Sequence, residues 1–302
     1  MTPICLVGIG KIAVDQHVPA IAGSDDWELA ATVSRAGTVD GVPSYTDFDQ
    51  MLAERPDIPV ISLCLPPVPR YDYAAKAIAA GRHVMLEKPS GATLAEVDSL
   101  ASMAKEAGVT LYTTWHSRMA NGVAPAKAWL ADKEITGAHI SWKEDVRRWH
   151  PGQEWVFAPG GMGVFDPGSN ALSIITEILP MPIHLRRADL HFPANRDTPI
   201  AAHLHWTQNV TGDFDWRQIG PQSWDITVET TAGTLALHEG GDRLVIDGED
   251  IVADEDREYP ALYERMAKLV KNGASEVDVS AMIHVADAFT LCKRITVDPF
   301  EF

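Results

Sequence analysis

The N-terminal part of the chain alternates short apolar runs with helical patterns. The runs contain so few polar positions that they predict strands buried on both faces, as in a parallel sheet. They cover residues 4–7, 29–33, 60–65, 83–86 and 109–112. Two of the helical segments between them, residues 73–80 and 94–107, each end at a glycine, where helices commonly stop. Strand alternating with helix predicts right-handed βαβ units and a doubly wound Rossmann domain.

The pattern changes after about residue 120. Apolar and polar positions there favour antiparallel strands joined by Gly, Pro and Asp turns. We expect these strands at residues 142–149, 200–210, 223–230 and 234–237, helices at 259–271 and 279–294, and a solvated acidic loop at 249–258. The sequence therefore predicts two domains: a cofactor-binding Rossmann domain at 1–120, and an α+β domain with a large, mainly antiparallel sheet at 121–302.

Composition narrows the classes of function. The 302 residues are 46% hydrophobic and carry 25 basic against 42 acidic side chains, a net charge of −17. Such a charge repels phosphate backbones and anionic lipids, so we expect neither a nucleic-acid nor a membrane partner. The three cysteines are far apart and form no CxxC pair. With no basic leader at the N-terminus, this favours a reducing compartment, the cytoplasm.

A glycine motif lies where the first predicted strand passes into a helix. Gly8, Gly10 and Ala13 form GxGxxA, in which the glycines allow a tight turn and a close approach to a pyrophosphate. The N–H groups of the following helix start, around Lys11 and Ile12, would face the phosphates. The alternative is a glycine turn with no ligand.

The end of the second predicted strand bears on the choice between NAD and NADP. A carboxylate there would bind the ribose 2′-hydroxyl of NAD, whereas a basic residue accommodates the 2′-phosphate of NADP. This chain has Ser34 and Arg35, a hydroxyl and a planar guanidinium that suit a phosphate. We expect NADP to bind well and NAD to be tolerated, the alternative being an ordinary exposed arginine.

A Glu-Lys-Pro sequence, Glu87 to Pro89, follows another predicted strand. Ligands of open α/β sheets bind beyond the carboxyl ends of the strands, so Lys88 is expected beside the nicotinamide. Near that cationic ring a partly desolvated ammonium is disfavoured. Lys88 is therefore a candidate to accept a proton or to stabilise a developing alkoxide.

Together these motifs resemble the glucose–fructose oxidoreductase / inositol dehydrogenase (Gfo/Idh/MocA) family of NAD(P)-dependent sugar oxidoreductases. The resemblance rests on GxGxxA, on Cys64, Leu65 and Pro66 after the third strand, on Glu-Lys-Pro, and on residues 160–170. Inositol dehydrogenase-like members carry Asp and, four residues on, His in the last motif; this chain has Asp166 but Asn170. Residues 15–17, 114–118 and 142–153 most resemble the bacterial aldose 1-dehydrogenases that act on L-arabinose or D-galactose.

The resemblance implies roles for individual residues. Lys88, Asp166 and Asn170 would form the reacting centre, while His116, Glu144 and His150 would bind sugar hydroxyls, with Trp149 or Trp155 as an apolar wall. The residues implied for NAD or NADP are Gly8, Gly10, Lys11, Ile12, Ser34, Arg35, Cys64, Leu65, Pro66, Glu87, Lys88 and Trp115. A homodimer or larger oligomer is also implied.

The residues themselves leave plainer interpretations open. Asp166 and Pro167 suit the N-cap and the first residue of a helix, which would place Asn170 on the same face one turn later. Glu144 alternates with other charged residues as on a half-solvated strand. His203 and His205 share a strand face, but no third ligand has suitable spacing, so we expect no metal.

The activity expected from this resemblance is oxidation of a pyranose at C1 to an aldonolactone, with hydride transfer to NAD(P). The C1 hydroxyl proton would pass to Lys88 or Asp166, which we expect to titrate together. The alternatives are an inositol or polyol dehydrogenase of the same family and a non-catalytic sugar-sensing regulator. The Asn170 substitution speaks against the first, and the intact Glu-Lys-Pro against the second.

Overall fold

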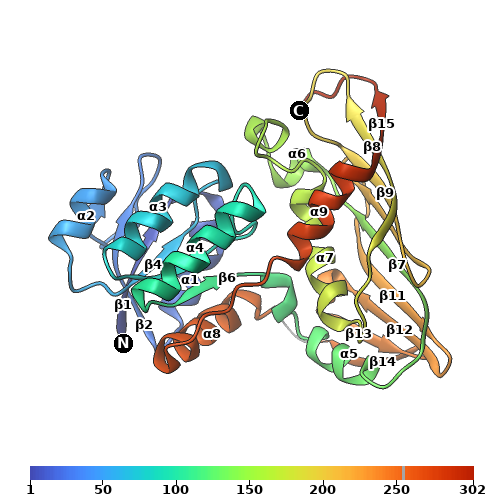
Figure 1. Ribbon diagram of the computed structural model, residues 1–302, viewed down its shortest axis with the longest axis horizontal. Helices are drawn as coiled ribbons and strands as arrows, with labels where there is room; N and C mark the ends of the chain where they lie inside the picture. The colour runs from blue at the N-terminus through green and yellow to red at the C-terminus, as the bar shows by residue number, and fades with distance from the viewer. Residues whose placement is uncertain (254–255) are drawn as a thin grey trace. The chain divides into compact units, whose positions relative to one another are not determined.

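The computed structural model describes residues 1–253 and 256–302, which fold into two compact units (Figure 1). Unit 1 comprises residues 1–116 and 259–279, and unit 2 comprises 117–258 and 280–302. The sequence-based division at residue 120 lies four residues beyond the boundary at 116 and misses a second difference. Residues 259–279, expected with the second domain, pack with the first. Within the described ranges, no helix is long and apolar enough to cross a membrane.

Unit 1 is built on a six-stranded parallel sheet in the order β3-β2-β1-β4-β5-β6. The order reverses between β1 and β4, as in a doubly wound Rossmann fold, so this part of the predicted fold is confirmed. Its strands are β1 (Thr2–Val7), β2 (Trp27–Val33), β3 (Ser44–Tyr45), β4 (Val60–Leu63), β5 (His83–Leu86) and β6 (Leu111–Thr113). Its helices are η1 (Ala13–His17, a π-helix), α1 (Val18–Ala22), α2 (Phe48–Glu54), α3 (Pro67–Ala79), α4 (Leu94–Ala107) and α8 (Glu258–Asn272).

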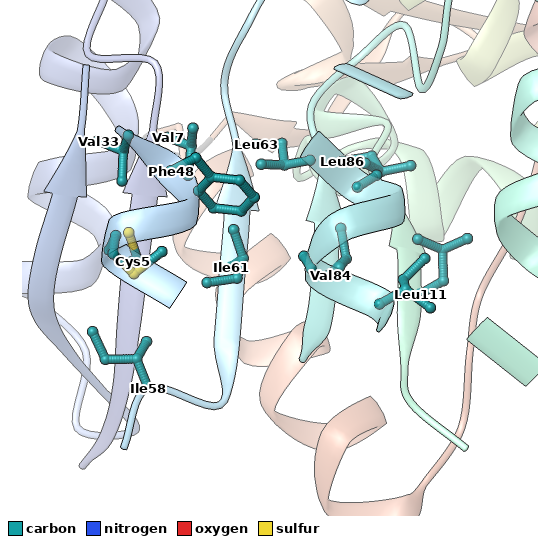
Figure 2. Close-up of a cluster of buried hydrophobic side chains, with 14 of the residues drawn as sticks. Cys5, Val7, Val33, Phe48, Ile58, Ile61, Leu63, Val84, Leu86 and Leu111 are labelled. Atoms are coloured by element: carbon teal, nitrogen blue, oxygen red, sulfur yellow. The ribbon is translucent and has the colours of Figure 1, made fainter. Parts of the chain in front are cut away.

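One face of this sheet packs on α2, α3 and α4. Figure 2 shows the resulting cluster, in which alternate residues of the strands point to the same side. The other face includes Ile4 and Leu6 and is also buried. There Trp27 of β2 donates a hydrogen bond to the backbone carbonyl of Tyr263 in α8, at 3.0 Å. Burial on both faces explains why the strands read as continuous apolar runs.

Unit 2 contains a nine-stranded sheet in the order β14-β13-β12-β11-β7-β10-β9-β8-β15. Two neighbouring pairs, β10 with β7 and β15 with β8, are parallel and the rest antiparallel, so the predicted large, mainly antiparallel sheet is confirmed. Its strands are β7 (Ile135–Lys143), β8 (Leu185–Pro193), β9 (Ala201–Trp206), β10 (Val210–Asp215), β11 (Ser223–Thr230), β12 (Gly233–His238), β13 (Arg243–Ile246), β14 (Glu249–Ala253) and β15 (Cys292–Val297).

The longer helices of unit 2 cover one face of this sheet (Figure 1). Helix α7 lies between α5 and α9, and most of its side chains are buried. The sheet face turned away from them carries polar residues such as His139 and His203, both about half exposed. The helical segments are η2 (His116–Met119), α5 (Val123–Leu130), α6 (Val146–Trp149), η3 (Glu154–Phe157), α7 (Phe165–Ile178), η4 (Glu239–Gly241) and α9 (Ser280–Leu291).

Several predicted elements of unit 2 are wrong in extent. The strand expected at 142–149 ends at Lys143, because the Asp145 side chain accepts a hydrogen bond from the Arg147 N–H and caps the short helix α6. The strand expected at 200–210 is two strands, since Gln208 and Asn209 adopt positive φ and turn the chain. The helix expected at 279–294 ends at Leu291 and continues as β15.

The acidic segment 249–258 is also more ordered than a solvated loop. Residues 249–253 form the edge strand β14, which pairs antiparallel with β13, and Glu258 begins α8. Residues 254–255 of the expected loop lie outside the described residues. Glu249 and Asp250 place charge on this edge strand, and such charge discourages pairing with other chains.

Candidate active site

The glycine motif forms a turn at the end of β1. Gly8 has φ +90°, and a Cβ there would lie 2.8 Å from Leu65 Cδ2, so only glycine fits. A Cβ on Gly10, in contrast, would meet no atom of the described residues within 4 Å. Gly10 is thus not needed for packing of the chain itself, and the open space beside it fits the close approach of a pyrophosphate. Ala13 is the first residue of η1 and is fully buried.

The residues that we expect to select between NAD and NADP lie at the end of β2. The Ser34 Oγ accepts hydrogen bonds from the N–H groups of Ala36 and Gly37, at 3.1 and 3.2 Å. These bonds shape a turn that leaves the Arg35 side chain exposed. An exposed guanidinium beyond the strand end can offer parallel N–H donors to a phosphate.

The residues after β4 lie against the glycine turn. The Cys64 N–H donates to the Val7 carbonyl at 2.8 Å. Leu65 is the residue with which a side chain at position 8 would clash. Pro66 is exposed and precedes Pro67, the first residue of α3. These contacts bring the predicted cofactor residues of the two strand ends together at one edge of the sheet.

The Glu-Lys-Pro turn follows β5, and the buried Arg70 side chain forms hydrogen bonds to its backbone. This arginine is 2% exposed, and its guanidinium donates to the backbone carbonyls of Leu65, Glu87 and Pro89. The Lys88–Pro89 peptide bond is cis, and the Lys88 side chain is half-buried. Arg70 therefore joins the loops after β4 and β5, although sequence reasoning missed it.

A buried polar network of His17, Glu87, Tyr259 and Tyr263 contacts the same turn. The Glu87 carboxylate accepts a hydrogen bond from the Tyr259 hydroxyl, at 2.7 Å, and another from the Lys88 backbone N–H. His17 Nε2 lies 3.4 Å from Glu87 Oε1, and His17 Nδ1 lies 2.7 Å from the Tyr263 hydroxyl oxygen. His17 and Glu87 are 0% and 4% exposed.

The charges in this network support each other. Burial alone would raise the pKa of Glu87, but His17, His116 and Tyr259 outweigh it and lower the pKa to about 2. Burial likewise opposes a charge on His17, yet Cys64, Tyr263 and Glu87 hold its pKa well above the usual range. The structure therefore buries two ionisable side chains, an imidazole and a carboxylate, next to each other.

Two further predicted residues follow β6 in unit 1. The Trp115 indole N–H donates to the Asp278 carbonyl at 3.0 Å, and this side chain is buried. The His116 ring stacks on Tyr259 with centroids 5.4 Å apart. Trp115 is thus held by the segment that follows α8, and His116 contacts a ring of the buried network.

In unit 2, Asp166 lies in the first turn of α7. The helix begins at Phe165 after Val164, so the predictions that Asp166 is the N-cap and Pro167 the first helical residue are wrong. The Asp166 carboxylate, 5% exposed at the residue level, instead lies 3.2 Å from His150 Nε2. Asn170 follows one turn later and is half-buried, and its side-chain amide makes no hydrogen bond to residues 1–253 or 256–302.

His150 connects Asp166 to a third side chain. Its Nδ1 lies 3.3 Å from Gln153 Oε1, which also accepts a hydrogen bond from the Trp155 indole at 3.2 Å. This orients the imidazole with Nε2 toward the carboxylate. The structure therefore brings Asp166, His150 and Trp155 together, with Gln153 as a bridge between the two rings.

Glu144 is held differently from the prediction. It follows the end of β7 and does not alternate along a strand, so that interpretation is wrong. Its two oxygens accept the indole N–H groups of Trp216 and Trp224, at 3.0 and 2.9 Å. Burial raises the pKa of Glu144, and the two indoles and His150 offset part of the rise. The buried carboxylate is therefore a hydrogen-bond acceptor held between two tryptophan side chains.

Trp149 contacts Trp224, the partner of Glu144, whereas the paired histidines lie on the exposed sheet face. Trp149 is 36% exposed, packs edge-on against Trp224 and donates to Gln222 Oε1 at 2.8 Å. His203 lies 2.6 Å from Asp213 Oδ1 on the exposed sheet face. Within the described ranges, no group of three or more His, Cys, Asp or Glu side chains could hold a metal ion.

Comparisons with known proteins find two similar galactose 1-dehydrogenases and a 3-ketoreductase that shares the fold. A galactose 1-dehydrogenase of Pseudomonas fluorescens is 38% identical over 299 residues, which cover 98% of this chain and 97% of that protein. The crystal structure of a D-galactose-1-dehydrogenase from Rhizobium etli is 52% identical and superimposes with a TM-score of 0.95, covering 99% of this chain and 97% of that one. KijD10, a 3-ketoreductase from Actinomadura kijaniata with NADP, shares the fold at 18% identity, with a TM-score of 0.79 over 98% and 99% of the chains.

The N-terminal match is to a family model. Residues 3–114 match the model described as oxidoreductase family, NAD-binding Rossmann fold. This match confirms the expected cofactor class, NAD or NADP. The open space beside Gly10 suits either dinucleotide. Because the curated relative is matched along almost its full length, the chain belongs to the glucose–fructose oxidoreductase / inositol dehydrogenase family of oxidoreductases.

Proposed function

We propose that this protein is an aldose 1-dehydrogenase that oxidises C1 of a pyranose to the aldonolactone with NADP⁺ or NAD⁺. The observation that carries the proposal is the 52% identity, over 99% of the chain, to a D-galactose-1-dehydrogenase. The unit 2 cluster of Asp166, His150 and Glu144 supports it, because carboxylates and imidazoles beside tryptophan side chains suit a ring with many hydroxyls.

When bound, the oxidised nicotinamide supplies the acceptor for the C1 hydride. The residues proposed to hold the dinucleotide are those predicted from the sequence: Gly8, Gly10, Lys11, Ile12, Ser34, Arg35, Cys64, Leu65, Pro66, Glu87, Lys88 and Trp115.

The chain itself provides the acceptor for the proton of the C1 hydroxyl. Lys88 and Asp166 are the two candidates. His150 Nε2 lies 3.2 Å from the Asp166 carboxylate, so the imidazole is placed to exchange a proton with it or to orient it. The Asn170 amide has donors and an acceptor to offer to a sugar hydroxyl. We assign His116, Glu144, His150 and one of Trp149 and Trp155 to sugar binding.

We infer D-galactose and L-arabinose as substrates, with D-fucose a third. In their pyranose forms galactose and arabinose share ring stereochemistry and differ in the exocyclic CH₂OH. One such group in a pocket is worth about 1–3 kcal/mol of discrimination, so mixed specificity is expected.

A panel of aldoses and inositols, each with NAD⁺ and NADP⁺, tests the proposal by absorbance of the reduced nicotinamide. Turnover of galactose and arabinose, with the lactone as the first product, is the expected result. Turnover of inositols alone would make the protein a polyol dehydrogenase. Absence of turnover with every sugar and both cofactors, in protein that binds the cofactor, would favour a sensing role.

The proposed preference for NADP⁺ has its own test in Arg35→Ala. Loss of a charge-assisted contact to the 2′-phosphate is expected to raise the Kd for NADP⁺ about 10-fold or more and to leave the Kd for NAD⁺ unchanged. Titration of protein fluorescence gives both constants, and exposed Lys105→Ala is the control. An unchanged ratio of the two constants would contradict the assignment.

We also propose that the protein forms a homodimer or larger oligomer and that it resides in the cytoplasm, as expected from its sequence.

A further inference from the structure

We propose that Tyr259, His17 and Tyr263 are positioning residues that fix the Glu87–Lys88–Pro89 turn, and through it the Lys88 amine, for proton transfer. The inference deepens the proposed function and rests on it, because it matters for catalysis only if Lys88 contacts the substrate. The three side chains reach the turn from two elements that are far apart in the sequence, η1 and α8.

The connection to Lys88 runs through Glu87. One carboxylate oxygen, Oε1, accepts the Tyr259 hydroxyl and lies beside His17 Nε2, while the other, Oε2, accepts the Lys88 backbone N–H. Both oxygens are therefore in use, and a rotation of the Glu87 side chain would break contacts at both ends. The network thus sets where the backbone of Lys88 lies, and not merely where Glu87 lies.

The rings that hold Glu87 are themselves confined. Tyr259 meets the His17 ring edge-on at 5.0 Å and the stacked His116 ring at 5.4 Å. Tyr263 meets His17 edge-on at 5.8 Å, and its hydroxyl oxygen lies 2.7 Å from Nδ1. A ring fixed on two sides can hold a hydroxyl at one point, which a flexible donor cannot do.

The energetics favour a positional role over a stabilising one. Burying an ionisable imidazole and a carboxylate 3.4 Å apart carries a desolvation penalty, whereas apolar residues of similar size would pack there without it. The polar groups that face His17 are Cys64 from the end of β4, Glu87 from the end of β5, and Tyr259 and Tyr263 from α8. A polar arrangement of this kind, bonded to the backbone of a candidate proton acceptor, indicates that its geometry is used.

Tyr259→Phe is the sharpest test, because it removes one hydroxyl and keeps the ring. We expect kcat for galactose to fall about 10-fold, the loss of one hydrogen bond to a charged group, with KM and the Kd for NADP⁺ changed less than twofold. Tyr263→Phe should act in the same direction. Tyr71→Phe is the matched control, since its hydroxyl pairs with Ser99 at 3.0 Å in the same unit but away from Glu87.

Hydrogen exchange of the Lys88 amide provides a readout that does not depend on turnover. In Tyr259→Phe the Lys88 N–H is expected to exchange about 10-fold faster, because its acceptor becomes mobile, while amides of β1 and β4 keep their rates. Faster exchange throughout unit 1 would mean a general loss of stability and would overturn the positioning role.

The outcomes separate the two proposals. Wild-type protein that turns over no aldose defeats the proposed function, whatever the exchange rates are. Normal aldose turnover in the wild type, combined with an unaltered kcat and Lys88 exchange in both tyrosine variants, overturns the positioning role alone. A lower kcat with an unaltered Lys88 amide also overturns it, because Tyr259 would then act by another route.

Discussion

Lys88→Ala is expected to lower kcat for aldose oxidation by about 10²–10⁴-fold, the usual contribution of a positioned proton-transfer group. The Kd for NADP⁺ should change much less, because backbone N–H groups and the Arg35 side chain are proposed to carry phosphate binding. The two quantities are measured by steady-state kinetics and by fluorescence titration. Their separation would identify a group that acts in the transition state more than in cofactor binding.

Two comparisons make this result specific. Lys76→Ala removes an exposed lysine that pairs with Asp49 in the same unit, and it should leave kcat unchanged. Asp166→Asn replaces the second candidate by an isosteric amide. Near-normal turnover in Lys88→Ala, accompanied by a large loss in Asp166→Asn, would transfer the role of proton acceptor to the carboxylate.

Arg70→Met is expected to give the largest loss of stability, about 3–5 kcal/mol in the free energy of unfolding of unit 1. Arg70 is 2% exposed, and its guanidinium donates to three backbone carbonyls after β4 and β5. Methionine keeps the apolar stem but leaves these carbonyls buried without donors. Urea denaturation, followed by circular dichroism, measures the change.

The control for this variant lies on the same helix. Lys76→Met also removes a cation from α3, but from an exposed surface pair, and it should leave the unfolding midpoint almost unchanged. Equal midpoints for Arg70→Met and the wild type would show that water or a rearranged side chain satisfies the carbonyls. In that case Arg70 would not be what holds the Glu-Lys-Pro turn.

The Rossmann half of the fold could be predicted closely from the sequence. Strands buried on both faces leave uninterrupted apolar runs, and the stop signals at Gly81 and Gly108 coincide with positive φ after α3 and α4. The mixed sheet of unit 2 could be predicted less accurately from the sequence. Its errors lie at Asp145, where a side-chain cap replaced a strand, and at Gln208 and Asn209, whose hairpin turn lacks glycine.

The candidate site divides in the same way. Motifs with fixed spacing, such as Gly8–Gly10 and Glu87–Lys88, identify themselves locally. The partners that hold them do not, because Arg70, His17 and Tyr259 reach the Glu-Lys-Pro turn only in the folded chain. In a single sequence, no local pattern distinguishes an arginine, histidine or tyrosine that holds a distant turn from one that does not. In unit 2, Trp216 and Trp224 were similarly missed as the donors to Glu144.

The place of α8 in unit 1 has a consequence for how the protein is made. The segment 259–279 reaches the cofactor unit only after the whole of residues 117–258 has been synthesised. A nascent chain that has emerged from the ribosome as far as residue 116 therefore still exposes the sheet face that Trp27 and Tyr263 later close. An N-terminal fragment cut at that point should aggregate readily, and a minimal cofactor-binding fragment would need residues 259–279 joined back by a linker.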